Sequence, residues 1–222
     1  MEKKQKKQME LRTIIDNIST NESGDCVVSG KAICFNDRQL IYTDRFGVNY
    51  YEMIDSHALD NCDLSDVCLK YNHGQEKLDV LARVRQKTLT LEIKDDGLYF
   101  TATLTNNLGQ DVYKAVQERE ITGCSFGFFV DSDDYDDMTN TRTILSIETL
   151  TEISIVDEPA YSNTSVEARN ENTPKWVSDI EEKRSKDRLE REKLILLSYL
   201  WYMRKYELLS GSVNEWNNKK SD

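Results

Sequence analysis

The segment Gly123-Cys124-Ser125-Phe126-Gly127-Phe128 decides the fold. Its phenylalanines recur at every second position, which is the period of a β-strand with one face in a core. Phe126 and Phe128 then face the core, while Ser125 faces outward beside Gly127, which has no side chain to crowd an approaching peptide carbonyl. A serine hydroxyl becomes a nucleophile only with a base within hydrogen-bond reach. The segment therefore predicts a strand that presents a candidate nucleophile, with the base supplied from elsewhere in the chain.

The sequence around this segment predicts a mainly β protein with flanking helices. Short apolar runs alternate with turn residues such as Asp95-Asp96-Gly97, where glycine supplies the positive φ of a tight turn. Many short strands with few helices indicate an antiparallel β-barrel. We expect strands at 26–35, 48–54, 67–71, 78–84, 88–93, 98–104, 124–130, 143–147 and 151–156, and a helix at 108–118. Five aspartates form an acidic loop between two of these strands: Asp131, Asp133, Asp134, Asp136 and Asp137.

Three regions follow from this pattern. Residues 1–24 form a polar N-terminal arm with a short helical stretch at 9–18, residues 25–165 form the β-barrel domain, and residues 166–222 form a linker and a helical tail. Thr173-Pro174 is typical of a helix start, and Gly211 of the position just past a helix end. We therefore expect one long C-terminal helix that ends near Leu209.

The expected C-terminal helix changes character along its length. Residues 181–193 are nearly all charged, whereas residues 194–209 are apolar or aromatic on more than one face. A helix that is apolar over so much of its surface is normally buried against something. The alternatives are its own domain, a partner protein, or a second copy of the chain in a homo-oligomer.

Composition excludes several classes of function. The 222 residues carry a formal net charge of −11, which leaves no basic footprint for nucleic acid. No apolar run approaches the ~20 residues of a membrane span, and no secretory signal is expected. The five cysteines are odd in number and lack C-x-x-C spacing, so reduced thiols of a cytosolic protein are expected. We expect no metal and no cofactor.

The chain has only two histidines, His57 and His73. Histidine is the side chain whose ordinary titration suits a general base near neutral pH. His73 follows an expected strand and is the stronger candidate, whereas His57 lies in a loop-like stretch. A surface or core histidine without catalytic function is the alternative interpretation.

A general base also needs a third group that holds its ring. Glu152 and Ser154 lie two residues apart on the last expected strand and share the face opposite Ile153 and Ile155. Glu152 is the preferred third member, with Ser154 and Asp157 as alternatives. The competing interpretation of Glu152 is an ordinary solvent-facing glutamate.

The run from Gly123 to Gly127 also matches the G-x-S-x-G pattern of α/β-hydrolases. That motif needs a strand followed by a helix, and the histidine comes last in the chain. Here both flanks predict strands, and no histidine follows Ser125. An α/β-hydrolase is therefore excluded.

Five patterns occur in one order along the chain. They are Gly30-Lys31-Ala32-Ile33-Cys34-Phe35, Asn72-His73, Asp95-Asp96-Gly97-Leu98-Tyr99-Phe100, Gly123 to Phe128, and Glu152 to Val156 with Pro159-Ala160. In this order, over roughly residues 25–165, they resemble the prohead proteases of tailed phages. These capsid-maturation serine peptidases are similar in fold to the herpesvirus assemblins. One departure is Gly74, where the family has aspartate.

The resemblance implies a serine endopeptidase with Ser125 as nucleophile, His73 as general base and Glu152 as the orienting carboxylate. It also implies scaffold or capsid protein as substrate and partner, inside an immature capsid in the host cytoplasm. Self-cleavage would fall at 162–173 or 181–193, and the helical tail would tether the enzyme to scaffold or shell. The alternative is a catalytically inactive scaffold or assembly protein on the same fold. Gly74 in place of aspartate mildly favours this alternative, whereas the presence of Ser125, His73 and Glu152 argues against it.

Overall fold

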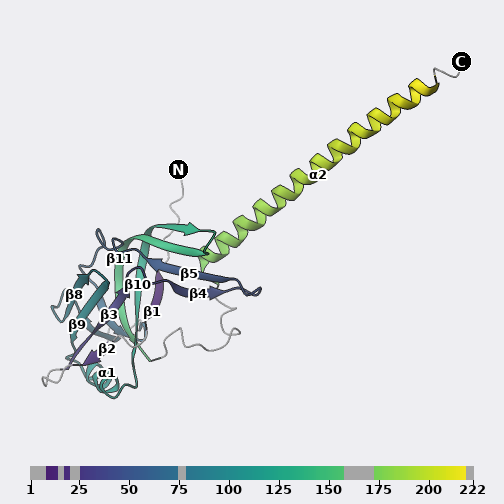
Figure 1. The fold of residues 1–222 in the computed structure, drawn as a ribbon. Helices are drawn as coiled ribbons and strands as arrows, with labels where there is room; N and C mark the ends of the chain where they lie inside the picture. The colour runs from purple at the N-terminus through teal and green to yellow at the C-terminus, as the bar shows by residue number, and fades with distance from the viewer. Residues whose placement is uncertain (1–8, 15–17, 21–25, 75–78, 158–172, 219–222) are drawn as a thin grey trace. The chain divides into compact units, whose positions relative to one another are not determined.

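The computed structural model describes residues 9–14, 18–20, 26–74, 79–157 and 173–218. The chain divides into two compact units, Met1–Asn170 and Glu171–Asp222. The first unit holds all the described strands and one helix, and the second holds a long helix (Figure 1). This confirms a mainly β protein with a long C-terminal helix.

The strands of the first unit form two sheets. The larger sheet has the order β1-β10-β11-β5-β4, and β6 pairs with β11 and with β7; the smaller sheet has the order β2-β3-β9-β8. A single closed barrel is not found among the described strands, so closure stays a prediction. The bounds are β1 Glu10–Ile14, β2 Ile18–Thr20, β3 Val27–Cys34, β4 Gln39–Thr43, β5 Asn49–Ile54, β6 Cys68–Tyr71, β7 Val80–Arg83, β8 Leu89–Lys94, β9 Gly97–Thr103, α1 Asn107–Gln117, β10 Gly123–Asp136 and β11 Thr141–Val156.

One hydrophobic core takes side chains from both sheets. The core residues predicted for β10 and β11 are buried together with residues of the smaller sheet, and the following members are all at most 2% exposed: Phe126, Phe128, Ile153 and Ile155 from the larger sheet, and Val28, Leu98 and Phe100 from the smaller one. Burying side chains of this size contributes about 1.5–3 kcal/mol each. The polar residues that alternate with them are therefore held on the opposite face of the larger sheet.

A register shift in the hairpin of β10 and β11 aims Glu152. Gly127 pairs with Glu152 and Phe128 with Leu150, so Thr151 is the extra residue of a bulge. The Thr151 hydroxyl donates to the Gly127 carbonyl at 2.7 Å. Because of the bulge, Leu150 and Ile153 both reach the core while Glu152 lies on the face of Ser125.

The N-terminal region departs from the expected polar arm. The helical stretch predicted at 9–18 is wrong: Glu10–Ile14 is strand β1, which pairs antiparallel with β10 and places Thr13 opposite Ser125. Ile18–Thr20 is strand β2 of the smaller sheet. Residues 10–14 therefore belong to the larger sheet, on the edge of the strand that carries the candidate nucleophile.

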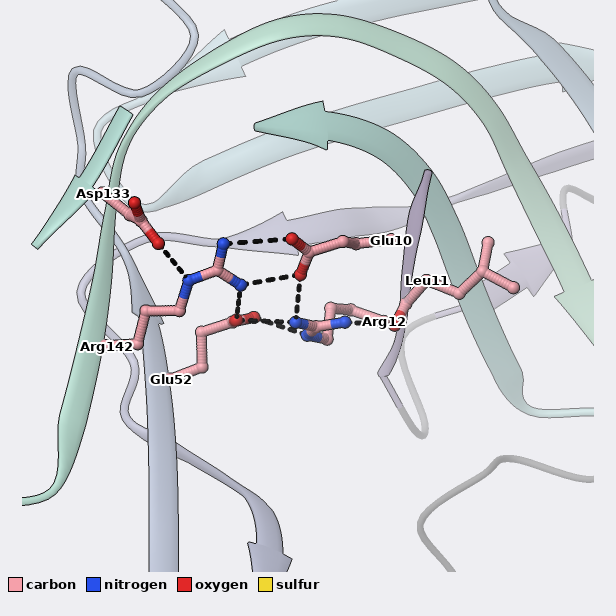
Figure 2. A network of polar contacts seen from close by, with 6 residues as sticks. All are labelled: Glu10, Leu11, Arg12, Glu52, Asp133 and Arg142. Atoms are coloured by element: carbon pink, nitrogen blue, oxygen red, sulfur yellow. Dashed lines mark hydrogen bonds and ion pairs between the residues drawn. The ribbon is translucent and has the colours of Figure 1, made fainter. Parts of the chain in front are cut away.

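A network of ion pairs connects β1 with the larger sheet. Figure 2 shows the Arg142 guanidinium between three carboxylates: it contacts Glu10 at 2.7 Å, Glu52 at 2.9 Å and Asp133 at 2.5 Å. Arg12 from β1 pairs with Glu52 at 2.5 Å and with Glu10 at 2.8 Å. Glu52 and Arg142 are buried. These charges compensate one another where water is excluded, which is the condition under which buried ions are tolerated.

The acidic loop predicted between two strands is also wrong. Strand β10 continues through Asp131, Asp133 and Asp134 to Asp136, and it pairs with β11 as far as Thr141. The first strand therefore ends six residues later than predicted, at Asp136 instead of residue 130, and the second begins two residues earlier, at Thr141 instead of residue 143. The Asp133–Arg142 pair gives an acidic residue a cross-strand partner that local sequence does not reveal.

The second unit is the helix α2, Lys175–Asn218. It begins directly after Pro174, whose carbonyl accepts from the amides of Val177 and Ser178, as the sequence predicted. It does not end near Leu209, because Gly211 is helical. No helix in the described ranges is both long and apolar enough to cross a bilayer. Its apolar middle is exposed, between 54 and 68%, at Leu194, Ile195, Leu196, Leu197, Tyr199, Leu200, Trp201 and Tyr202.

Candidate active site

Ser125 lies near the start of β10, with Thr13 of β1 on one side and Ser154 of β11 on the other. The residue is 0% exposed, and its Oγ has no hydrogen-bond partner among the described residues. Ser125 shares a face of the sheet with Ser154 and Glu152, as strand alternation predicts. That face is not open to solvent at Ser125, although an outward orientation was expected. A buried, unpartnered hydroxyl costs stability, and such groups are tolerated where function requires them.

Gly127 has a different role from the expected one. The sequence suggested an open approach for a peptide carbonyl beside Ser125. Instead, a Cβ at position 127 would lie 3.0 Å from Cγ of Glu152 and 3.0 Å from Cδ2 of Leu11. Glycine at this position therefore lets Glu152 and Leu11 lie close across β10, and neighbouring side chains already occupy this space.

His73 stands on a tight turn at the end of β6. The Gly74 amide donates to the Tyr71 carbonyl at 2.9 Å, and the two central residues have positive φ, 46° for Asn72 and 55° for His73. Two positive φ values are typical of type I′ turns. A histidine in this region is strained, at a cost of the order of 1–3 kcal/mol. The turn is held by Asn72, whose Oδ1 accepts from the Asp157 amide at 3.1 Å.

Gly74 is the position at which the resemblance departs from the family pattern. A side chain there would collide with the Cβ and carboxylate of Asp79. The Asp79 side chain thus fills the volume that a residue-74 side chain would need. Glycine at position 74 is explained by packing and does not require a loss of catalysis.

Glu152 joins the candidate residues. Its Oε1 lies 2.6 Å from Nδ1 of His73 and accepts weakly from the Ser154 hydroxyl at 3.4 Å. Its Oε2 lies 2.5 Å from Nζ of Lys70. The residue is only 3% exposed. Burial raises the pKa of Glu152, but hydrogen bonds and charges from His73 and Lys70 outweigh this and hold it below its ordinary value.

The other candidates lie elsewhere. His57 is an exposed residue that pairs with Asp60 on its own turn at 3.1 Å. Asp157 accepts from the Tyr71 hydroxyl at 2.9 Å. The structure therefore brings Glu152 to His73, and it places Ser154 directly opposite Ser125 in the strand register.

Lys70 is the residue that sequence reasoning missed. It occupies the register position opposite Ser154 on β6, next to the β11 strand that carries Glu152. The signal was present in the sequence: a lysine stands between Leu69 and Tyr71 in an otherwise apolar strand, three residues before His73. Only strand pairing reveals that its ammonium group reaches Glu152.

The described residues contain no group of three or more His, Cys, Asp or Glu side chains arranged to hold a metal ion. The side chains assembled on the face of Ser125 are instead a hydroxyl, an imidazole and a carboxylate. That composition is the one used by serine hydrolases.

Comparison with known proteins gives the family. The family model of the caudovirus prohead serine protease matches residues 12–176. The chain belongs to this family and is a serine peptidase of phage prohead maturation. Family membership supports the enzyme over the catalytically inactive alternative.

A solved structure similar to this chain is the capsid assembly protease of bacteriophage T4. It is 13% identical, with a TM-score of 0.45, and the match covers 68% of this chain and 99% of that one. No curated protein sequence matches the chain.

Proposed function

We propose that Ser125, His73 and Glu152 form the catalytic triad of this peptidase. The observation that carries the proposal is the 2.6 Å contact between Nδ1 of His73 and Oε1 of Glu152, on the face that also holds Ser125. With Nδ1 directed to the carboxylate, Nε2 is the ring nitrogen that takes the proton from the Ser125 hydroxyl. The hydroxyl then attacks the peptide carbonyl, and the imidazolium returns the proton to the leaving amine.

The burial of Ser125 gives this mechanism a requirement. Ser125 is 0% exposed and its Oγ makes no hydrogen bond to a described residue, so the imidazole does not engage the hydroxyl and a substrate could not reach it in this conformation. A rearrangement must expose Oγ and bring it within hydrogen-bond reach of His73 before attack. We propose that the described state is a resting state of the enzyme.

The test is covalent labelling of the full chain with a fluorophosphonate probe, followed by mass spectrometry of the labelled peptide. Label is expected on Ser125, and it should be lost in Ser125→Ala and His73→Ala. Ser132→Ala is the matched control, because Ser132 is an exposed serine on the same strand. Label that persists in Ser125→Ala would overturn the nucleophile assignment. A chain never labelled, even within assembling capsids, would favour the inactive scaffold.

The proposed substrates are scaffold protein or the scaffold segment of the capsid protein, inside the immature capsid in the host cytoplasm. Family membership supports this setting. An assemblin-like closed barrel belongs to the same proposal, supported by the single core that the two sheets share. We propose no nucleic-acid or membrane partner, consistent with the net charge of −11.

Self-cleavage is proposed in the segment 162–173, of which residues 162–172 lie outside the described residues. The other candidate segment for self-cleavage, 181–193, lies within α2. A peptidase binds its substrate in an extended form, so that segment would first have to unwind.

We propose that α2 attaches the enzyme to scaffold, shell or a second copy of the chain. The exposed apolar residues at 194–202 support this role, because a continuous apolar surface of this kind is typical of an interaction site. Leu197→Asp with Trp201→Asp should reduce self-association in sedimentation and incorporation into capsids, while fluorophosphonate labelling persists. Glu190→Gln on the charged part of the helix is the control. Unchanged assembly in the double variant would exclude this surface.

A further inference from the structure

Lys70 lies beside the proposed triad in an unusual position for a lysine. Its Nζ is 2.5 Å from Oε2 of Glu152, and the two side chains are only 18% and 4% exposed. Lys70 and Glu152 come from adjacent strands, and Lys70 pairs in register with Ser154. An exposed ion pair contributes little, but a pair shielded from water interacts strongly. The contact is therefore more than a surface ion pair.

The Glu152 carboxylate is shared between an imidazole and an ammonium group. Oε1 contacts His73 Nδ1 and the Ser154 hydroxyl, and Oε2 contacts Lys70. The next cation on the neighbouring strand, Arg83, is paired with Asp66 instead. Cys68, which pairs with Glu152 in register, is a further titratable group here, and burial raises its pKa. Lys70 is thus the fixed positive charge at this carboxylate.

We propose that Lys70 is a positioning residue of the peptidase: it holds the Glu152 carboxylate with Oε1 toward His73, and it withdraws part of the carboxylate's charge from the imidazole. This inference rests on the proposed triad. Its physical basis is that an anion shared with an ammonium group stabilises an imidazolium less than an unshared anion does. Lys70 therefore keeps the Glu152 carboxylate, and through it the ring of His73, in one orientation.

Because the chain has only two histidines, the effect of Lys70 on His73 can be measured directly. Full-length protein with ¹³C-labelled histidine is titrated by NMR, and His57→Gln identifies the signal of His73. In Lys70→Met and in Lys70→Gln the midpoint measured for His73 should move upward from that of the wild type, because the carboxylate charge is no longer shared. Lys70→Arg should restore the wild-type midpoint. Lys94→Met, which removes an exposed lysine on β8, is the control and should leave it unchanged.

Fluorophosphonate labelling across pH supplies the second readout. The acid limb for Lys70→Met and Lys70→Gln should move upward by the same amount, which lowers labelling at pH values below the limb. An unchanged midpoint and an unchanged limb in both variants would overturn the role of Lys70. Failure of the triad itself has a different outcome: the Ser125→Ala variant would still be labelled. If Ser125→Ala is blank and the Lys70 variants titrate like the wild type, the triad stands and only the Lys70 inference is wrong.

Discussion

Nδ1 of His73 lies 2.6 Å from Oε1 of Glu152, although 79 residues separate them in sequence. His73 reaches this position from a turn with two positive φ values, and Glu152 from the strand residue that follows the Thr151 bulge. The contact between His73 and Glu152 therefore depends on irregular backbone at both residues: the turn at His73 and the bulge next to Glu152. Bulges and strained turns are frequent next to active sites because they aim single side chains.

Loss of the carboxylate should impair catalysis less than loss of the base. Glu152→Gln retains the shape of the side chain but not its charge, and we expect a drop of about 10⁴ in kcat, against about 10⁶ for His73→Ala. Cleavage rates of capsid or scaffold protein measure this. Asp157→Asn is the control, since its carboxylate contacts Tyr71 rather than His73. Equal rates for Glu152→Gln and wild type would remove Glu152 from the triad.

Ser125→Ala should raise stability while it abolishes activity. The Ser125 hydroxyl is buried and unpartnered, so its removal relieves an unsatisfied polar group of about 1 kcal/mol or more. The free energy of unfolding from urea titration should therefore increase. Ser154→Ala is the matched comparison, because Ser154 donates to Glu152 and its loss gives no such gain. A less stable Ser125→Ala protein would mean that the hydroxyl is not orphaned in solution.

Asn72 should tolerate glycine better than alanine. The φ of Asn72 is +46°, where alanine is penalised by roughly 1–2 kcal/mol and glycine is not. Both variants also lose the hydrogen bond from the Asp157 amide. We expect unfolding free energies, and labelling rates at Ser125, in the order wild type, Asn72→Gly, Asn72→Ala. An alanine variant as stable as the glycine variant would argue against the positive φ.

Arg142 should be essential for stability. Its side chain is buried between Glu10, Glu52 and Asp133, so Arg142→Met leaves these carboxylates with less compensation and should cost about 3–5 kcal/mol. Arg83→Met removes a more exposed pair with Asp66 and should cost no more than about 1 kcal/mol. Urea unfolding of both variants provides the comparison. Similar small losses for the two would show that the network does not anchor β1.

Acid should weaken the fold through Glu10 and Glu152. Burial raises the pKa of Glu10, but Arg142 and Arg12 outweigh it, so the folded-state pKa lies below the ordinary 4.5; the same direction holds for Glu152. These carboxylates therefore stabilise the fold above about pH 4.5, and this contribution disappears as pH falls through their folded-state pKa. The unfolding free energy should decrease over this range, less steeply in Glu10→Gln. Identical slopes would contradict the role of Glu10.

Features that depend on residues close together in sequence could be predicted, whereas features that depend on another strand could not. The core face of β10 was predictable from Phe126 and Phe128, because alternation is a property of a single strand. The acidic stretch and residues 10–14 were misassigned for the opposite reason. Their charged side chains disfavour a strand locally, and only cross-strand partners such as Arg142 for Asp133 stabilise them there.

Period, turn chemistry and residue type were enough to predict the mainly β class, the long C-terminal helix and the candidates Ser125, His73 and Glu152. The fold was needed to show that Ser125 is buried without a partner among the described residues, that Gly127 accommodates Glu152 and Leu11, and that Lys70 shares the Glu152 carboxylate. Those features depend on which strands pair and in which register. Register joins residues far apart in sequence, so no local pattern encodes it.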